Sequence, residues 1–314
     1  MFKYILKRLL QLIPAFFIIT ALVFFLSAAA PGDPVDAVLA SIDDVTPEME
    51  AQIRAQYGLD KPVPVRYLIW LRNLLQGDMG ISTQTHEPVW DMIRDRIGPT
   101  LTLTGTALLI SLLIAIPLGI LAAIKPYSIW DNISSFLAFI GSSLPGFFVA
   151  LMLIFIFAVN LKWLPTMGMY DRDGTGLAKH LILPVIVTVL RMMGTYIKQT
   201  RGSILDVMNE EYVKAARAKG ISEFQVLIKH VLRNALIPIV SCIGLNIPFL
   251  VGGATVTEKI FGWPGMGTLL VQAISQRDYN VIMGVTVLIA LVVLVVNLLI
   301  DLVYAYLDPK IRFE

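Results

Sequence analysis

The stretch "IGPTLTLTGTALLISLLIAIPLGILAAI" (Ile97–Ile124) contains no Asp, Glu, Lys or Arg. A helix needs about 20 apolar residues to cross the hydrocarbon core of a bilayer, and this run is long enough. The rest of the chain has a similar character, because 56% of its 314 residues are hydrophobic and only 15% are charged. That composition is too apolar for an ordinary soluble domain. The sequence therefore predicts a protein that spans a membrane.

Four further uncharged runs also predict membrane-spanning helices. They are Leu9–Gly32, Asn132–Leu161, Asn234–Thr257 and Tyr279–Ile300. A sixth span is predicted at Leu181–Thr200, although Pro184, Arg191 and Lys198 interrupt it. With six spans and both termini inside, Lys and Arg are concentrated on the cytoplasmic side, as the positive-inside rule requires. For the first run a cleaved signal peptide is the alternative, although its apolar stretch exceeds the roughly 7–15 residues typical of such a signal.

Residues 31–98 are predicted to form a small, mostly helical extracytoplasmic segment. Thr46 is a typical N-cap for a helix that ends at Gly58, and Val63–Gly77 has apolar residues at helical spacing. Pro88–Ile97 is amphipathic, so it either lies along the membrane surface or packs on this outer segment. The predicted organisation is residues 1–30 for the N-terminus and first span, 31–98 for the outer segment, and 99–314 for a core with spans two to six.

Residues 201–233 form a long charged segment inside the cell, between predicted spans four and five. Glu210 and Glu211 begin a helix-prone stretch that ends at Lys219, an order that complements the helix dipole. Gly220 is a typical C-terminal cap residue, and Ser222 opens a second helix with a capping box. The segment is therefore predicted to be a helix, a glycine turn and a second helix that project into water.

Two adjacent alanines in this segment, Ala215 and Ala216, present almost no side chain. A groove on a partner protein can approach the backbone closely at that point, with Tyr212, Arg217 and Lys219 supplying contacts around it. The alternative is a solvated loop between helices, which is what most charge runs are.

Several classes of function lack the residues that they need. The net charge of +2 is too small to indicate a surface that binds nucleic acid. No G-x-x-x-x-G-K-[ST] motif is present, so any energy from a nucleotide has to come from another chain. The three histidines lie in three separate segments and Cys242 is the single cysteine, so no metal site is predicted. No G-x-S-x-G motif supports a hydrolase, and the chain is predicted to be non-catalytic.

Polar residues within the predicted spans are candidates for a substrate path. Glycine and proline in "SSLPGFF" (142–148) and "FGWPGMG" (261–267) predict bends, and irregular backbone at membrane depth needs protein or a water-filled cavity beside it. Arg191 is predicted to line the path or to pair across a subunit interface; the alternative is that it snorkels to the headgroups. The other candidates, for which hydrogen bonding between helices is the alternative role, are Ser142, Ser143, Asn246 and Asn297.

The chain resembles ABC importer permeases of the dipeptide, oligopeptide and nickel class. The resemblance is carried by "EYVKAARAKG" (211–220) and "HVLRNALIP" (230–238), and by four further blocks in order. These are "APGDP" (30–34), "YGLDKP" (57–62), "TEKIFGWPGMGTLL…AISQRDYNVIMG" (257–284) and "NLLIDLVYAYLDPKI" (297–311). The implied fold is all-α, a six-helix transmembrane permease like those of type I ABC importers.

In that family a short cytoplasmic helix ending at a glycine fits into a cleft of the ATPase subunit. The resemblance gives this coupling role to Glu211, Ala215, Ala216 and Gly220. Tyr212 and Val213 separate the glutamate from the alanines, which departs from the broad importer pattern but is usual for the peptide class.

The resemblance implies one half of the translocation path for di- and oligopeptides in an ATP-driven importer. The implied partners are a second homologous permease, two ABC ATPase subunits that bind ATP and Mg²⁺, and an extracytoplasmic substrate-binding protein. This chain itself is expected to bind no cofactor, and its place is the bacterial or archaeal cytoplasmic membrane. Nickel or metal chelates, glutathione and oligosaccharides are alternative cargoes. Alternatives of another class are an intramembrane hydrolase, which lacks a convincing nucleophile and base here, and a secondary transporter, which often shows inverted repeats.

Overall fold

The computed structural model describes residues 2–29, 46–56 and 58–307. Within these ranges the chain is built from helices, and the only β-type pairing there is an isolated bridge between Ile81 and Pro88. The "APGDP" stretch at 30–34 and the rest of the predicted outer segment up to residue 45 lie outside the described residues, as do residues 308–314.

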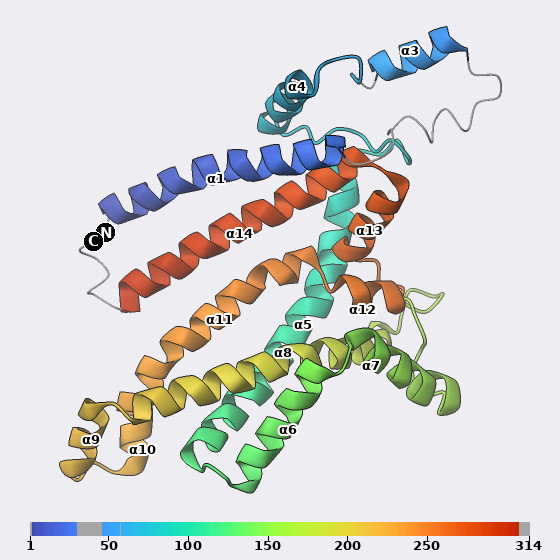
Figure 1. The fold of residues 1–314 in the computed structure, drawn as a ribbon. Helices are drawn as coiled ribbons and strands as arrows, with labels where there is room; N and C mark the ends of the chain where they lie inside the picture. Colours follow the sequence, from blue (N-terminus) through green and yellow to red (C-terminus); the bar gives the residue numbers. More distant parts are fainter. Residues whose placement is uncertain (1, 30–45, 57, 308–314) are drawn as a thin grey trace.

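Helices follow one another along the chain with short connections (Figure 1). One end of the molecule, predicted to be extracytoplasmic and called the outer end below, contains α3 (Pro47–Gln56) and α4 (Val63–Leu75). The other end, predicted to be cytoplasmic and called the inner end below, contains α9 (Glu211–Ala218), α10 (Glu223–Gln225) and the π-helix η2 (Val226–Leu232). The remaining elements are α1 (Phe2–Ala29), α5 (Val89–Ile124), α6 (Ile129–Ser143), α7 (Gly146–Leu153), the π-helix η1 (Ile154–Asn160), α8 (Leu177–Met208), α11 (Arg233–Gly252), α12 (Thr255–Ile260), α13 (Met266–Gln276) and α14 (Tyr279–Leu307).

The predicted all-α membrane fold is confirmed. In the described part of the chain, five helical stretches are long and apolar enough to cross a membrane, and a sixth span is obtained if α6 and α7 are counted together. The first stretch, Leu10–Ala29, corresponds to the run for which a signal peptide was the alternative.

The run predicted as one straight span at Asn132–Leu161 is two helical arms. The chain bends by 101° between Ile129–Ser143 and Gly146–Asn160. Leu144 has an extended backbone (φ −83°, ψ 128°) because the ring of Pro145 disfavours the helical conformation of the residue before it. The "SSLPGFF" stretch therefore forms the predicted bend, which divides the predicted span.

Helix α5 begins earlier than its uncharged run predicts. It has 36 residues, which gives a length of about 54 Å, well beyond the roughly 30 Å of a hydrocarbon core. Its first turns contain the amphipathic stretch predicted to lie on the membrane surface or on the outer segment. Val89 and Ile93 are instead fully buried in a cluster with Met266 of α13 and Val281 of α14. The helix runs without a break through residue 98, where the sequence predicted a domain boundary.

Helix α8 forms the centre of the core and packs against α5, α6 and α11. Small residues let the backbones approach closely, as is usual between membrane helices. A Cβ on Gly141 of α6 would overlap the Leu190 carbonyl, and one on Gly119 of α5 would contact Thr200. Two thirds of the apolar window of α8 (67%) is buried, against 6% for α1.

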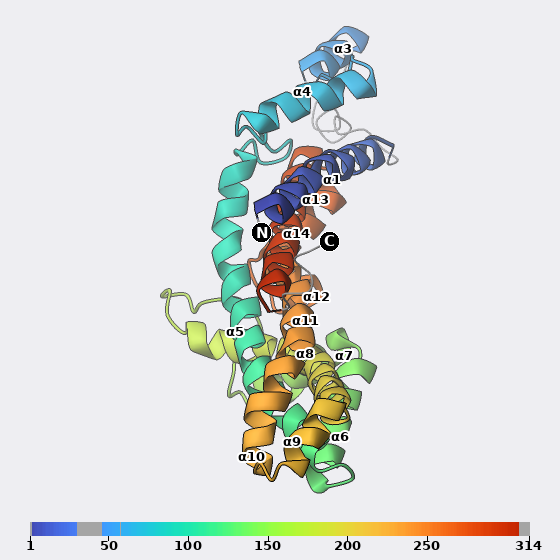
Figure 2. The ribbon, with the colours of Figure 1, turned by 90° about the vertical axis from the view of Figure 1, so that its left-hand side faces the viewer.

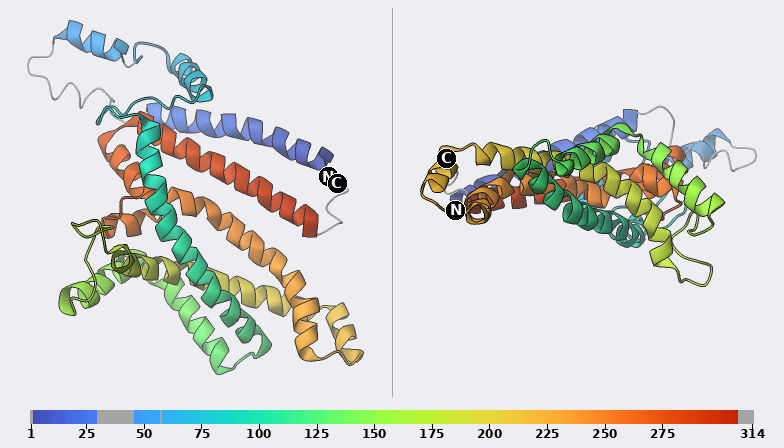
Figure 3. Two further views of the ribbon diagram at one scale, coloured as in Figure 1. Left: turned by 180° about the vertical axis from the view of Figure 1, so that it is seen from behind. Right: turned by 90° about the horizontal axis from the view of Figure 1, so that it is seen from below.

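The helices form a shallow layer rather than a closed bundle (Figure 3), with α11 between α8 and α14. Helices α1 and α14 lie side by side and run in opposite directions (Figure 1). In Figure 2, α9 and α10 lie at one end of the molecule and α3 and α4 at the other. Much of the surface between the two ends is apolar and exposed, including Phe136, Phe139 and Leu245.

Candidate functional site

In the hairpin of α9 and α10, the first helix ends as the sequence predicted. Gly220 has a left-handed backbone (φ +75°), which a residue with a Cβ rarely adopts. Its amide donates to the Arg217 carbonyl at 2.9 Å, and the Ile221 amide donates to the Ala216 carbonyl at 3.4 Å. These two bonds form a Schellman motif and satisfy carbonyl groups at the end of α9.

An ion pair closes the hairpin. Arg217 donates from Nε and Nη2 to the two carboxylate oxygens of Glu223, at 3.0 and 3.3 Å. The predicted capping box is wrong, because the side chain of Ser222 makes no capping hydrogen bond. Helix α10 has only three residues, after which the chain continues as the π-helix η2. The rigidity of the turn therefore comes from Gly220 and the Arg217–Glu223 pair.

The two faces of α9 differ. Val213 and Ala216 are buried in a cluster with Ile204 of α8 and Val226 and Val231 of η2. Away from that cluster, the exposed residues are Glu211, Tyr212, Lys214, Ala215, Ala218, Lys219 and Gly220. The prediction of one exposed face containing both alanines is wrong for Ala216, because Ala216 stands three residues after Val213 and shares its inward side.

Contacts within the hairpin hold several of the predicted coupling residues. The Tyr212 hydroxyl accepts a hydrogen bond from the Asn234 side-chain amide at 2.7 Å, which ties α9 to the start of α11. Lys214 pairs with Glu211 at 2.9 Å. A mostly apolar cavity of about 260 Å³ opens between the hairpin and the inner ends of α5 and α8, next to the exposed ring of Phe224. The hairpin is thus anchored on one side and open on the other.

Two of the predicted path residues meet at the bend between α6 and α7. Ser142 and Arg191 line the same cavity of about 130 Å³. The Arg191 guanidinium lies 5.9 Å from the centre of the Phe249 ring of α11. Ser142 donates to the Ala138 carbonyl at 2.7 Å and accepts from the Lys198 ammonium at 3.3 Å. Ser143 is exposed beside them.

The other two predicted path residues do not line this cavity. Asn246 lies on α11, one turn before Phe249, and its amide donates to the Cys242 carbonyl at 2.7 Å. Asn297 is exposed on α14.

Sequence reasoning gave no role to Glu258, which is fully buried near the outer end of α11. Its carboxylate accepts a hydrogen bond from the Thr100 hydroxyl at 3.0 Å and another from the Thr268 amide at 3.1 Å. Thr100 in turn accepts from the Met266 amide at 2.7 Å. A Cβ on Gly253, Gly265 or Gly267 would overlap atoms of this carboxylate, so the glycines of "FGWPGMG" make room for it. The sequence signal that could have indicated this buried carboxylate is an acidic residue between an apolar span and a glycine-rich turn.

A second long-range contact missed from the sequence fixes the inner end of α6. Arg201 of α8 donates from Nε and Nη2 to the two oxygens of Asp131, at 2.8 and 3.1 Å. Asp131 also accepts from the Tyr127 amide at 3.0 Å. Arg201, the first residue of the predicted charged segment, therefore holds α8 to the start of α6.

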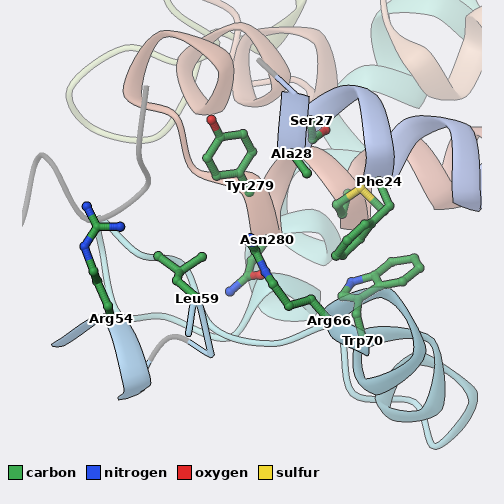
Figure 4. A pocket seen from close by; sticks show the side chains of 10 residues that line it. Phe24, Ser27, Ala28, Arg54, Leu59, Arg66, Trp70, Tyr279 and Asn280 are labelled. Carbon is green, nitrogen blue, oxygen red and sulfur yellow. The ribbon is translucent and has the colours of Figure 1, made fainter. Parts of the chain in front are cut away.

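The outer surface carries a cavity of about 200 Å³ (Figure 4). Phe24 and Ser27 of α1, Arg66 and Trp70 of α4, and Asn280 of α14 line it, so it lies where the outer segment meets the membrane helices. Among the described residues, no group of three or more His, Cys, Asp or Glu is placed to hold a metal ion.

The chain matches two family models. One, described as "Binding-protein-dependent transport system inner membrane component", matches residues 115–313. The other, described as the N-terminal part of such a membrane component, matches residues 1–104.

Curated relatives are similar over the full chain. A putative peptide permease protein of Brucella suis biovar 1 (strain 1330) is 43% identical, with 99% of each chain covered. The oligopeptide transport system permease protein AppB of Bacillus subtilis (strain 168) is 42% identical, with both chains covered completely. The glutathione transport system permease protein GsiC of Escherichia coli (strain K12) is 40% identical, also over 100% of both chains.

Among solved structures, a chain of the MetNI methionine ABC transporter in an inward facing conformation aligns with a TM-score of 0.55. The alignment covers 69% of this chain and 96% of that chain at 18% identity, so the likeness is one of fold.

Proposed function

The chain belongs to the family of binding-protein-dependent transport system inner membrane components, and from that premise we propose how this permease subunit of an ABC importer performs its part. The exposed face of α9 seats in an ATPase subunit and relays its movement to the membrane helices. The residues proposed to make or shape this contact are Glu211, Tyr212, Ala215, Ala216, Arg217, Lys219 and Gly220. The observation that carries the proposal is the two-sided packing of α9.

The hairpin has the mechanical properties that such a relay needs. Its inward face joins α8, η2 and the start of α11 through buried side chains and the Tyr212–Asn234 hydrogen bond. A push on α9 is therefore transmitted to two membrane helices. Within this face Ala216 acts by packing, while Ala215 leaves room for a partner to approach the backbone.

The assembly proposed around this chain contains a second homologous permease, two ATPase subunits that bind ATP and Mg²⁺, and an extracytoplasmic substrate-binding protein. Four apolar windows are less than half buried within the chain, namely those of α1, α5, α14 and the stretch Glu223–Ile260 that contains α11, and they supply surface for lipid and for the second permease. The binding protein docks at the end that carries α3 and α4. Both termini lie in the cytoplasm of a bacterial or archaeal cell.

The proposed cargo is a di- or oligopeptide, passing near Ser142, Ser143, Arg191, Asn246 and Asn297. Two full-length relatives are named as peptide or oligopeptide permeases, which favours peptides over metal chelates or oligosaccharides. Glutathione is a second candidate, because the glutathione permease GsiC is similar over its full length.

Site-specific crosslinking tests the docking of α9. Cys242 is the single cysteine, so a Cys242→Ser background permits one new cysteine at a time. In membranes that hold the complete importer, Ala215→Cys should crosslink to an ATPase subunit, whereas Ala178→Cys on the outer part of α8 should not. An Ala215→Cys chain that never crosslinks to an ATPase, although the importer takes up peptide with ATP, would contradict the proposed role of α9.

A further inference from the structure

Two cations, Arg191 and Lys198, share one exposed face of α8. They are seven residues apart, which is two helical turns or about 10 Å along the axis. Thr195 lies between them on the same face and is also exposed. The opposite face, with Met192, Tyr196 and Ile197, is buried in the core. The helix therefore holds both charges on the side that the core does not use.

Neither cation pairs with an acid in the part of the chain that the structure describes. Arg191 contacts the Phe249 ring, and Lys198 donates to the Ser142 hydroxyl. The next basic residue on α8, Arg201, is by contrast neutralised by Asp131. A cation near the middle of a membrane helix is costly unless it faces a water-filled cavity or a counter-charge. This face of α8 can therefore bind a negatively charged group that comes from outside the chain.

The two cations open onto neighbouring cavities. Arg191 lines the cavity of about 130 Å³ at the bend between α6 and α7, and Lys198 lines one of about 380 Å³ with Ser135 and Arg201. Ser142 connects them, because it lines the first cavity and accepts a hydrogen bond from Lys198. Non-helical backbone such as this bend persists at membrane depth only beside protein or water.

We propose that Arg191, Lys198 and Ser142 form a binding strip for a carboxylate, and that its ligand is the C-terminal carboxylate of the peptide in transit. The inference rests on the proposed import of peptides and adds a recognition chemistry to it. A guanidinium and an ammonium both donate charge-assisted hydrogen bonds to a carboxylate. Ser142 donates its own proton to the Ala138 carbonyl, and its oxygen accepts from Lys198 and so positions the ammonium. Because the cations stand at two depths, the carboxylate passes from one to the other without being held by both. The same chemistry would also accept an acidic side chain of the second permease, and the test separates the two sources.

The test uses the complete importer in proteoliposomes, with its second permease, ATPases and binding protein. The probes are trialanine and trialanine amide, each supplied at a concentration that saturates the binding protein, so that selection by that protein does not contribute. The quantity measured is the ratio of the ATP-dependent uptake rates of the acid and the amide. The double variant Arg191→Gln/Lys198→Gln should lower this ratio by roughly tenfold, since hydrogen bonds between charged groups are lost only for the acid. The single variant Arg191→Lys, which keeps both positive charges, should retain most of the wild-type ratio.

Lys179→Gln removes an exposed cation near the outer start of the same helix and is the matched control. It should leave the ratio unchanged. The proposal is overturned if the double variant keeps the wild-type ratio, or if both rates fall in parallel. It is also overturned if the double variant no longer copurifies with the second permease, because the carboxylate then belongs to that chain. Absence of ATP-dependent uptake by the wild type would instead refute the proposed function itself.

Discussion

At the outer end of α11, Glu258 is fully buried and accepts hydrogen bonds from Thr100 and Thr268 of its own chain. At the inner end, α9 buries Val213 and Ala216 but leaves Ala215 and its neighbours exposed. The packing around Glu258, called the outer block below, thus satisfies its buried carboxylate with donors from the same chain. The inner hairpin is also well packed, but one of its faces is left exposed. The difference indicates that the outer block fixes the geometry of α5, α12 and α13, and it supports the proposal that the inner hairpin receives a partner.

The largest expected effect is at the outer block. Gly265→Ala places a methyl group on the Glu258 carboxylate, which has no room to move among its donors. Overpacking of this kind should cost about 3 kcal/mol and lower the midpoint of thermal unfolding in detergent. Gly105→Ala on α5 is the control, because nothing lies within 4 Å of its added Cβ. Equal midpoints for the two variants would show that the packing around Glu258 accommodates the added methyl group.

A smaller loss of stability is expected at the inward face of the hairpin. Ala216 is 6% exposed and packs against the cluster that contains Val226 and Val231, so Ala216→Leu should cost about 2 kcal/mol. The measurement is again the thermal midpoint, together with protease sensitivity of the α9–α10 turn. If Ala216→Leu were as stable as wild type, the two faces of α9 would not differ as described.

Much of the fold follows from the sequence, because the thickness of the hydrocarbon core sets the length of a spanning helix and the cost of burying charge in it keeps charged residues out. Uncharged runs predicted α1, α5, α11 and α14, and Gly220 predicted the end of α9. The 101° bend at Pro145 was hidden because both arms remain uncharged, so the run read as one span. The early start of α5 was missed because burial of Val89 and Ile93 depends on α13 and α14, which lie far along the chain.

The candidate site was recovered only in part, for similar reasons. The spacing of Val213 and Ala216 contains the information that they share a face, but composition alone suggested a continuous alanine surface. The Asp131–Arg201 pair joins residues that are 70 positions apart, and no local sequence pattern predicts it. Ser142 and Arg191 were predicted to lie along one path and do line one cavity, whereas the approach of Lys198 to Ser142 depends on how α6 packs against α8.

The central claim, that the exposed face of α9 couples ATP hydrolysis to transport, is tested most directly by Ala215→Trp. Because Ala215 is exposed, this change should alter the stability of the isolated chain by no more than about 0.5 kcal/mol. In the reconstituted importer it should nevertheless abolish peptide uptake and the stimulation of ATP hydrolysis by loaded binding protein. Wild-type uptake by a correctly folded Ala215→Trp permease would contradict the account.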